Sequence, residues 1–263
     1  MTNPPTIARR EFLAAGLLAA AADPAAAAPS RGYAIVELRQ YTCRAGRRDA
    51  LATLFEREFI ESQEALGAHV MGIFRDRDDP DRFVWLRGFD SMPARAQALG
   101  AFYGGPVWRA HRQAANATML DSDNVLLLHP ATAGGGFELA PQRPRSPDGL
   151  LAFIHYLDDA TLPGFADFFK AEMVRQAAAD GGEVLATFAS ETSRNTFPAL
   201  PVRERDRVFI WLARPGSGGE ARFLDRRHQR SGWRDGAAEP LLPAFMRKPE
   251  LLRLAPSARS PLG

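Results

Sequence analysis

The chain has 263 residues, of which 46% are hydrophobic and 24% charged, with a formal net charge of +2 and one cysteine. This composition is ordinary for a globular protein. The near-neutral charge and the lack of a Lys/Arg run exclude nucleic acid as the expected partner. Because Cys43 is alone, an intrachain disulfide framework and a cysteine-based zinc site are also excluded. The length fits one large or two small domains, and a chain of this size can form a stable core without disulfides or other cross-links.

The first 28 residues have the pattern of a twin-arginine signal peptide. Arg9 and Arg10 precede an apolar run over residues 13–22, and alanines fill positions 25–28. A charged start, a short apolar run and a small-residue cleavage region are typical of export signals, and the run is too short to span a membrane as a helix. An alanine-rich tail is the alternative. The pattern predicts a mature protein that is periplasmic or secreted and has no membrane span.

Residues 33–130 show the pattern of one ferredoxin-like unit. Strand signals are alternation and β-branched or aromatic runs, and helix signals are apolar residues at helical spacing with capping residues at the ends. The expected elements are strand 33–41, helix 47–66, strands 68–75 and 83–87, a helix from Ser91 to the Gly104-Gly105 break, a helix from Pro106, and strand 123–128. This order, β-α-β-β-α-(α)-β, is that of a ferredoxin-like fold.

A Gly- and Pro-rich linker, residues 131–149, leads into a second copy of the unit at residues 150–255. Positions of the first helix return 114 residues later, so that Phe55 matches Phe169 and Tyr41 falls opposite His155. Positions of strand 83–87 return 126 residues later, so that Phe83 and Trp85 match Phe209 and Trp211. The offset changes in a longer hairpin loop of the second copy, residues 193–204. We therefore predict an α+β protein with two tandem ferredoxin-like units.

Three runs carry a family resemblance: Glu37-Leu38-Arg39-Gln40-Tyr41 with the turn that follows, residues 74–89, and Phe102-Tyr103-Gly104-Gly105-Pro106 with the helix to Asn116. Through them the chain resembles the NIPSNAP family, densely over residues 33–130 and more thinly over the second copy. The resemblance implies a dimeric α/β-barrel in which two ferredoxin-like sheets close face to face, here within one chain. It implies no particular reaction. Animal members are associated with mitochondria and with trafficking and protein interaction.

If the sheets face each other, strand alternation places one face of each strand inside the barrel. The expected interior residues are Glu37, Arg39, Tyr41, Phe83, Trp85, Arg87, Phe153, His155, Phe209 and Trp211. The opposite, apolar face of the first strand is then expected under the helices. Aromatic walls with a few convergent polar groups are typical of a small-molecule pocket.

Two interpretations of the polar residues are open. Arg39 or Arg87 holds a ligand carboxylate, and Glu37 or His155 accepts a proton as a catalytic residue. Alternatively, Glu37 and Arg39 form a structural ion pair and His155 is a satisfied core histidine. The further candidate ligand-binding residues are Tyr41, Trp85, Tyr103, His111 and Trp211, and for His111 helix packing is the alternative role.

No metal-ligand spacing, nucleophile elbow or dinucleotide fingerprint occurs, and the acidic turn 76–81 lacks the EF-hand pattern. The sequence therefore names no cofactor, and haem-type or cofactor-independent chemistry enters only by analogy with related barrels. One hypothesis is a barrel protein that binds a small aromatic or carboxylate-bearing molecule. The other is a non-catalytic binding or scaffold protein, with copies of the chain or other proteins as partners. A polar void between the sheets favours the first, and a packed interior with an exposed apolar patch favours the second.

Overall fold

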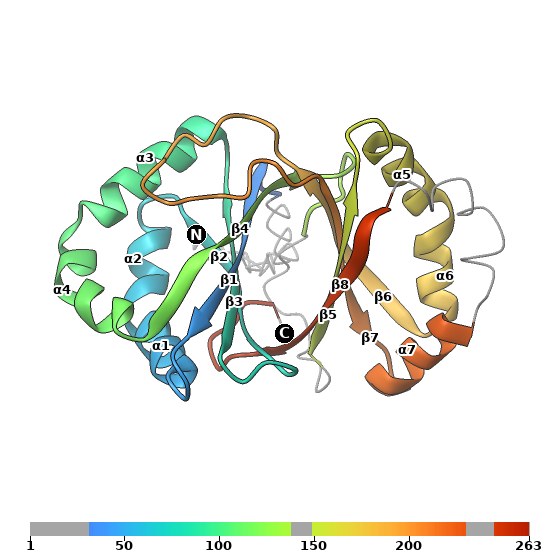
Figure 1. Ribbon diagram of the computed structural model, residues 1–263, viewed down its shortest axis with the longest axis horizontal. Coiled ribbons are helices and arrows are strands. Elements are labelled where there is room, and N and C mark those ends of the chain that lie inside the picture. The colour runs from blue at the N-terminus through green and yellow to red at the C-terminus, as the bar shows by residue number, and fades with distance from the viewer. Residues whose placement is uncertain (1–31, 138–148, 230–244, 263) are drawn as a thin grey trace, which may run out of the picture.

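A computed structural model describes residues 32–137, 149–229 and 245–262, where eight antiparallel strands close into one barrel with helices on two opposite flanks (Figure 1). The strands are β1 (Ile35–Cys43), β2 (His69–Asp76), β3 (Arg82–Phe89), β4 (Met119–Pro130), β5 (Leu150–Leu157), β6 (Gly182–Ser190), β7 (Val208–Pro215) and β8 (Phe245–Pro256). The helices are α1 (Arg48–Leu54), the π-helical turn η1 (Phe55–Phe59), α2 (Ile60–Glu64), α3 (Met92–Tyr103), α4 (Pro106–Asn116), α5 (Leu162–Phe168), the π-helical turn η2 (Phe169–Met173), α6 (Val174–Ala179) and α7 (Gly219–Gln229).

The barrel consists of two halves with the same strand order. Around the barrel the strands run β1-β3-β2-β8-β5-β7-β6-β4, so β4-β1-β3-β2 is followed by its equivalent β8-β5-β7-β6. Both orders are those of a ferredoxin-like sheet, which confirms the α+β class and the closure of the barrel within one chain. The halves join at two short seams, β2 with β8 and β4 with β6, each of three residue pairs.

The element ends follow local chemistry that the sequence shows. Ser91 is the N-cap of α3, and its hydroxyl accepts a hydrogen bond from the backbone N–H of Ala94 at 3.2 Å. Pro106 is the first residue of α4, where its missing N–H is not needed. Gly67 ends the first helical stretch with φ at 85°, a conformation that favours glycine. These three predicted boundaries are confirmed.

Each half interrupts its first helix with a π-helical turn, which helical periodicity did not predict. The turns η1 and η2 begin at Phe55 and Phe169, which are 114 positions apart, so the structure supports the repeat register. Strand pairing agrees, because Arg39 lies opposite Trp85 in the first half and Phe153 lies opposite Trp211 in the second.

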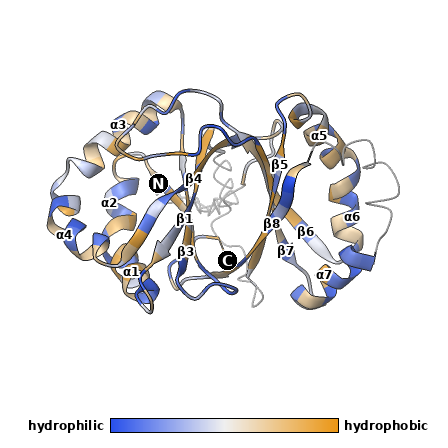
Figure 2. Ribbon diagram, in the orientation of Figure 1, coloured by the Kyte–Doolittle hydropathy of each residue, from blue (hydrophilic) through white to orange (hydrophobic). Residues whose placement is uncertain are grey.

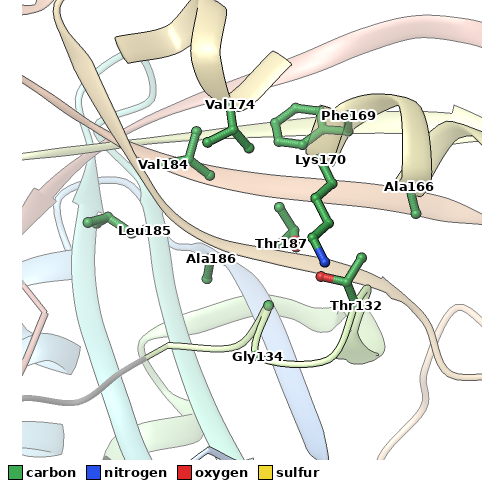
Figure 3. A pocket seen from close by; sticks show the side chains of 11 residues that line it. Thr132, Gly134, Ala166, Phe169, Lys170, Val174, Val184, Leu185, Ala186 and Thr187 are labelled. Carbon is green, nitrogen blue, oxygen red and sulfur yellow. The ribbon is translucent and has the colours of Figure 1, made fainter. Parts of the chain in front are cut away.

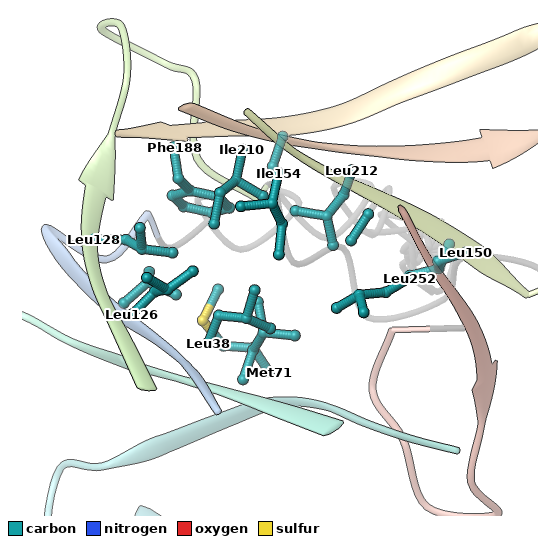
Figure 4. Packing of buried hydrophobic residues seen from close by; sticks show 14 of the residues in the cluster. Leu38, Met71, Leu126, Leu128, Leu150, Ile154, Phe188, Ile210, Leu212 and Leu252 are labelled. Carbon is teal, nitrogen blue, oxygen red and sulfur yellow. The ribbon is translucent and has the colours of Figure 1, made fainter. Parts of the chain in front are cut away.

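The barrel interior is a packed aliphatic core to which both halves contribute (Figure 4). Its fully buried members include Leu38 and Leu126 from the first half and Ile154, Ile210 and Leu252 from the second. In the ribbon coloured by hydropathy, hydrophobic residues are frequent in the strands, and the helices combine hydrophobic and hydrophilic residues (Figure 2). A small eight-stranded barrel leaves just enough interior space for such side chains.

The prediction for the barrel interior is therefore wrong for every residue that it named. These side chains lie on the outer face of the sheet, under the helices: Glu37, Arg39, Tyr41, Phe83, Trp85 and Arg87 in the first half, and Phe153, His155, Phe209 and Trp211 in the second. The prediction assumed that only a helix-covered face must be apolar. Barrel closure buries the other face as well, and aliphatic side chains fill that narrower space.

Residues 1–28, with the expected signal peptide, and most of the expected linker 131–149 lie outside the described residues. Within the part of the chain that is described, no helix is long and apolar enough to cross a membrane. The domain limits 33–130 and 150–255 stay predictions.

Candidate functional site

Three arginines surround one carboxylate in the layer between the first-half sheet and its helices. Glu37 accepts hydrogen bonds from Arg39 Nη1 at 2.8 Å, from Arg87 Nε at 2.7 Å and from Arg95 Nε at 2.6 Å. Arg39 and Glu37 come from β1, Arg87 from β3 and Arg95 from α3, and all four side chains are fully buried. We call these four residues the arginine cluster.

The arginine cluster carries an excess of positive charge. Burial by itself raises the pKa of Glu37, but Coulombic attraction to Arg87, Arg39 and Arg95 outweighs burial and holds that pKa well below its usual range. Glu37 is therefore ionised, and it compensates one of the three guanidinium charges. Burial also lowers the pKa of Arg95. A buried charge without a counter-ion is costly, so this excess needs an explanation.

The cluster also contains hydrogen-bond donors without acceptors. Arg39 Nη2, Arg87 Nη2 and Arg95 Nη2 are buried and have no hydrogen-bond partner among the described residues. The indole Nε1 of Trp85 is in the same situation. Buried donors in folded proteins are nearly always paired, so these four donors can bind ordered water or an acceptor-rich ligand.

A small aromatic cavity of about 90 Å³ adjoins the arginine cluster. Its wall includes Tyr41, Gln63, Trp85 and Tyr103, together with side chains of α1, η1, α3 and α4. Two of these wall residues hold the arginines: the Tyr41 hydroxyl accepts from Arg39 Nε at 2.7 Å, and Gln63 Oε1 accepts from Arg87 Nη1 at 2.9 Å. The wall therefore separates the cavity from the cluster by one layer of polar side chains.

A loop from the other half of the chain borders the cavity. The loop between β6 and β7, residues 191–207, crosses the first half toward α3 (orange in Figure 1). Arg95 Nη1 donates to Asn195 Oδ1 at 3.0 Å and to Thr196 Oγ1 at 3.2 Å. The ring of Phe197 stacks on Tyr103 with centroids 5.9 Å apart, and Leu200 joins the cavity wall. The first-half site thus depends on the second half.

In the second half, the position equivalent to the arginine cluster is occupied by side chains of that same half. Trp211, the counterpart of Trp85, donates its indole N–H to His155 Nε2 at 3.1 Å. Phe153 stacks on Trp211 with centroids 4.1 Å apart, and the guanidinium of Arg227 lies 4.6 Å from the Trp211 ring. Burial, and then repulsion from Arg227, lowers the pKa of His155 to about 3, so this histidine is neutral. Of the equivalent residues Trp85 and Trp211, only Trp85 has a buried N–H that is unpaired among the described residues.

The structure brings some of the sequence-predicted site residues together and separates others. Glu37, Arg39 and Arg87 lie in the cluster, and Tyr41, Trp85 and Tyr103 lie in the cavity wall. His155 and Trp211 belong to the second half, in a different packing cluster, so His155 does not share a site with Glu37. His111 is half-buried on α4, with its Nε2 3.4 Å from Glu58 Oε2.

Sequence reasoning missed Arg95, Gln63 and the loop residues Asn195 and Thr196. A signal for Arg95 was present, because it shares the buried stripe of α3 with Ala98, Leu99 and Phe102. A charged residue at helical spacing within an apolar stripe has to meet a buried partner. The loop residues gave no such signal, since nothing local in residues 193–204 shows that they reach the other half.

A second cavity of about 170 Å³ lies against β6 and η2 in the second half. Lys170 extends toward Thr132 across it, and the other walls are largely aliphatic (Figure 3). Lys170 is exposed, and no wall residue of this cavity has an unpaired buried polar atom. The described residues contain no group of three His, Cys, Asp or Glu placed to hold a metal ion. The arginine cluster with its aromatic cavity is therefore the stronger candidate.

Solved structures define the class of this protein. The chain is similar to a candidate monooxygenase from Lactobacillus acidophilus NCFM, with 14% identity, 85% of this chain and 94% of that chain covered, and a TM-score of 0.52. It is also similar to one from Fusobacterium nucleatum, with 7% identity, coverages of 86% and 93%, and a TM-score of 0.54. At such identities the likeness shows the fold alone. The protein has the dimeric α/β-barrel fold, with both halves of the barrel in one chain.

The family comparison is more specific for the first half. Residues 36–132 match the model of the NIPSNAP family. A NIPSNAP family protein from Agrobacterium tumefaciens is 24% identical over 38% of this chain and 88% of its own, with a TM-score of 0.35. No curated protein matches the chain. A second NIPSNAP-like domain over residues 150–255 stays a prediction.

Proposed function

We propose that this protein binds a small carboxylate-bearing molecule at the aromatic cavity beside the arginine cluster. The observation that supports the proposal is the buried excess of guanidinium charge, with three arginines around Glu37 and an unpaired Nη2 on each. A ligand carboxylate would compensate that charge and accept the unpaired N–H groups. The proposal moves the expected ligand from the barrel interior, which is packed with aliphatic side chains, to the helix side of the first-half sheet.

The volume of the cavity favours a short-chain ligand over an aromatic one. An apolar cavity of about 150 Å³ holds benzene, whereas this cavity measures about 90 Å³. A short aliphatic carboxylate fits this volume. An aromatic carboxylate enters only if Tyr103 moves together with the stacked Phe197.

The residue roles follow from the hydrogen bonds. Glu37 orients the three arginines, and its lowered pKa makes it a poor proton acceptor at neutral pH. The Tyr41 hydroxyl accepts from Arg39 and presents its O–H to the ligand. Trp85 presents its indole N–H. His155 packs in the second half and already accepts from Trp211. This set of groups supports binding and positioning of an anion, and it assigns no acid–base step to Glu37 or His155.

Titration calorimetry with acetate, propionate and benzoate tests the proposal. We expect acetate and propionate to bind and benzoate to bind more weakly. The Arg39→Ala variant should lose binding of acetate and propionate while it still unfolds cooperatively in urea. If Arg39→Ala loses stability but binds these carboxylates as the wild type does, the Glu37–Arg39 pair is structural and the proposal is wrong.

The scaffold hypothesis has one supporting observation, the packed barrel interior. Its other requirement is a contiguous exposed apolar patch. Among the described residues the exposed large hydrophobic side chains are Leu66, Leu120, Val174 and Met246, which come from four different segments. The carboxylate-binding function therefore has the stronger support.

We also propose export by the twin-arginine route, because Arg9 and Arg10 are followed by an apolar run. Replacing both arginines with lysine should retain the protein in the cytoplasm, and cell fractionation measures this. Unchanged export of the double variant would contradict the proposed route.

A further inference from the structure

We infer that the ligand of the arginine cluster is a short dicarboxylate, a dianion with four oxygen acceptors. The inference rests on the proposed function, which requires one carboxylate, and it adds the second. It follows from the charge of the cluster, the number and kind of its unpaired atoms, and the space beside it.

The charge of the cluster calls for two negative charges. Arg39, Arg87 and Arg95 each hydrogen-bond Glu37, and their other side-chain partners are the uncharged Tyr41, Gln63, Asn195 and Thr196. No second carboxylate bonds these guanidiniums in the described ranges. Three cations and one anion leave an excess of two positive charges in a fully buried place. A monocarboxylate would compensate half of that excess, and a dicarboxylate all of it.

The unpaired atoms at the cluster are all donors. They are the three Nη2 groups and the indole N–H of Trp85, and among the described residues no buried acceptor of the cluster or of the cavity wall is without a partner. A dicarboxylate supplies four oxygens, one for each of the four donor groups, whereas each of the two oxygens of a monocarboxylate would have to accept from two of them. The second half provides an internal comparison. There the equivalent indole N–H is paired with His155, so the unpaired N–H of Trp85 is specific to the first-half site.

The geometry requires the two carboxylates to be close together. All three guanidiniums bond one carboxylate of Glu37 at 2.6–2.8 Å, so the three guanidinium groups lie close to one another. The cavity of about 90 Å³ limits the chain that joins the carboxylates. Tyr41 and Gln63 stand between this cavity and the arginines, so a ligand that bridges both must pass these two side chains. Malonate, with one carbon between its carboxylates, is the probe that these limits favour.

Calorimetry on the full mature chain at constant ionic strength and neutral pH compares malonate, acetate, hydrogen phosphate and sulfate. We expect malonate to bind at least about tenfold more tightly than acetate, the difference of one added charge-assisted contact. Hydrogen phosphate and sulfate have no second carboxylate, and they should bind more weakly than malonate. The Arg95→Gln variant lowers the charge excess to one, and should lose the preference for malonate while its affinity for acetate changes by less than about threefold.

Two matched controls accompany this variant. Arg57→Gln removes an exposed arginine that, among the described residues, pairs with Glu58 alone, and it should leave the malonate affinity unchanged. Trp85→Phe removes the unpaired indole N–H and should weaken malonate binding, whereas Trp211→Phe removes the N–H that His155 already accepts and should not. The tryptophan pair keeps the test decisive if Arg95→Gln does not fold.

The outcomes separate the inference from the proposed function. Equal affinities for acetate and malonate would overturn the dicarboxylate and leave the carboxylate-binding function standing. Tighter binding of hydrogen phosphate or sulfate than of malonate would overturn the dicarboxylate in favour of an inorganic oxyanion. Binding of none of the four anions would overturn the proposed function itself. Equal losses in Trp85→Phe and Trp211→Phe would show that the site is not where we place it.

Discussion

At the scale of single residues, Glu37 is the side chain on which the first-half site depends. Its two carboxylate oxygens hold Arg39, Arg87 and Arg95 in place, and all four side chains are excluded from solvent. Removing one partner of a buried ion pair leaves an uncompensated charge, which destabilises a protein strongly. Here a neutral residue at position 37 would leave three buried cations together.

The Glu37→Gln variant should therefore lower the free energy of unfolding by about 3–5 kcal/mol. Urea denaturation of the wild type and the variant measures this. Glu183→Gln is the control, because Glu183 pairs with Arg214 on the surface with 56% of its side chain exposed, and it should change stability by less than about 0.5 kcal/mol. A loss in Glu37→Gln no larger than in Glu183→Gln would contradict the assignment of Glu37 as the centre of the cluster.

A second prediction at the scale of residues concerns how His155 makes the stability of the protein depend on pH. Burial, followed by repulsion from Arg227, lowers its pKa from 6.5 to about 3. Between these values the unfolded chain binds the proton and the folded protein does not, so stability rises with pH. The contribution of His155 is complete above pH 6.5 and falls as the pH drops toward 3, by up to about 1.4 kcal/mol per pH unit.

The His155→Gln variant keeps an acceptor for Trp211 and removes this titration. Its stability should vary less with pH between 6.5 and 3 than that of the wild type, as urea midpoints at a series of pH values would show. The exposed His228 gives the control, since His228→Gln should retain the wild-type pH dependence. A wild-type slope in His155→Gln would mean that other groups cause the acid sensitivity.

Residue-scale reasoning from the sequence found most of the cluster but placed it on the wrong side of the sheet. Alternation correctly grouped Glu37, Arg39 and Tyr41 on one face of β1. It could not tell which face the helices cover, because barrel closure buries both faces. Arg95 contacts Glu37 from 58 residues away, and a single sequence does not report such a contact.

At the scale of elements, the two halves share the π-helical turns, and the β6–β7 loop distinguishes them. The turns place equivalent aromatic rings together, Phe55 with Trp85 at 4.6 Å and Phe169 with Trp211 at 5.2 Å between centroids. The spacing of apolar residues predicted the first helix of each half. It did not predict the π-helical turn within that helix. The loop 191–207 has no counterpart of similar length in the first half, where residues 77–81 join β2 to β3.

The long loop should respond to its contact with Arg95. The Asn195→Ala variant loses one of the two acceptors for Arg95 Nη1, while Thr196 Oγ1 remains, and it also loses the bond from Asn195 Nδ2 to the Leu200 carbonyl at 2.9 Å. We expect faster hydrogen exchange over residues 191–204 and at least about threefold weaker malonate binding, as loss of a hydrogen bond to a charged group implies.

Arg194→Ala is the matched control for this loop, because Arg194 is exposed and adjacent to Asn195. It should change neither exchange nor affinity. If Asn195→Ala accelerates exchange but leaves malonate affinity intact, the loop closes over the cavity without contributing to the ligand site.

At the scale of the whole molecule, the barrel is one folded unit because its interior belongs to both halves. Val36, Leu38 and Val84 of the first half pack against Ile154 and Ile210 of the second in a single buried cluster. A first half on its own would expose this aliphatic sheet face, a patch that a soluble monomer rarely tolerates. It would also expose the edges of β2 and β4, which otherwise pair with β8 and β6.

These two edges match each other. In the repeat, β8 is the counterpart of β4 and β6 is the counterpart of β2, so each seam joins a second-strand edge to a fourth-strand edge. Two copies of the first half can therefore make both seams with each other and close the same barrel with twofold symmetry. We predict that residues 32–137, expressed alone, form a homodimer, whereas the full mature chain closes its barrel without a partner.

Light scattering after size-exclusion chromatography measures the mass of the fragment and of the full chain. The Leu38→Asp variant of the fragment places a charge on the shared face and should abolish the dimer, because a dimer would bury that charge unpaired. Glu61→Gln, on the outer surface of α2, is the control and should leave the dimer intact. A fragment that is monomeric and unfolds cooperatively would show that the first half is stable with its sheet face in water. Barrel closure would then be a consequence of the tandem linkage and not of the apolar face.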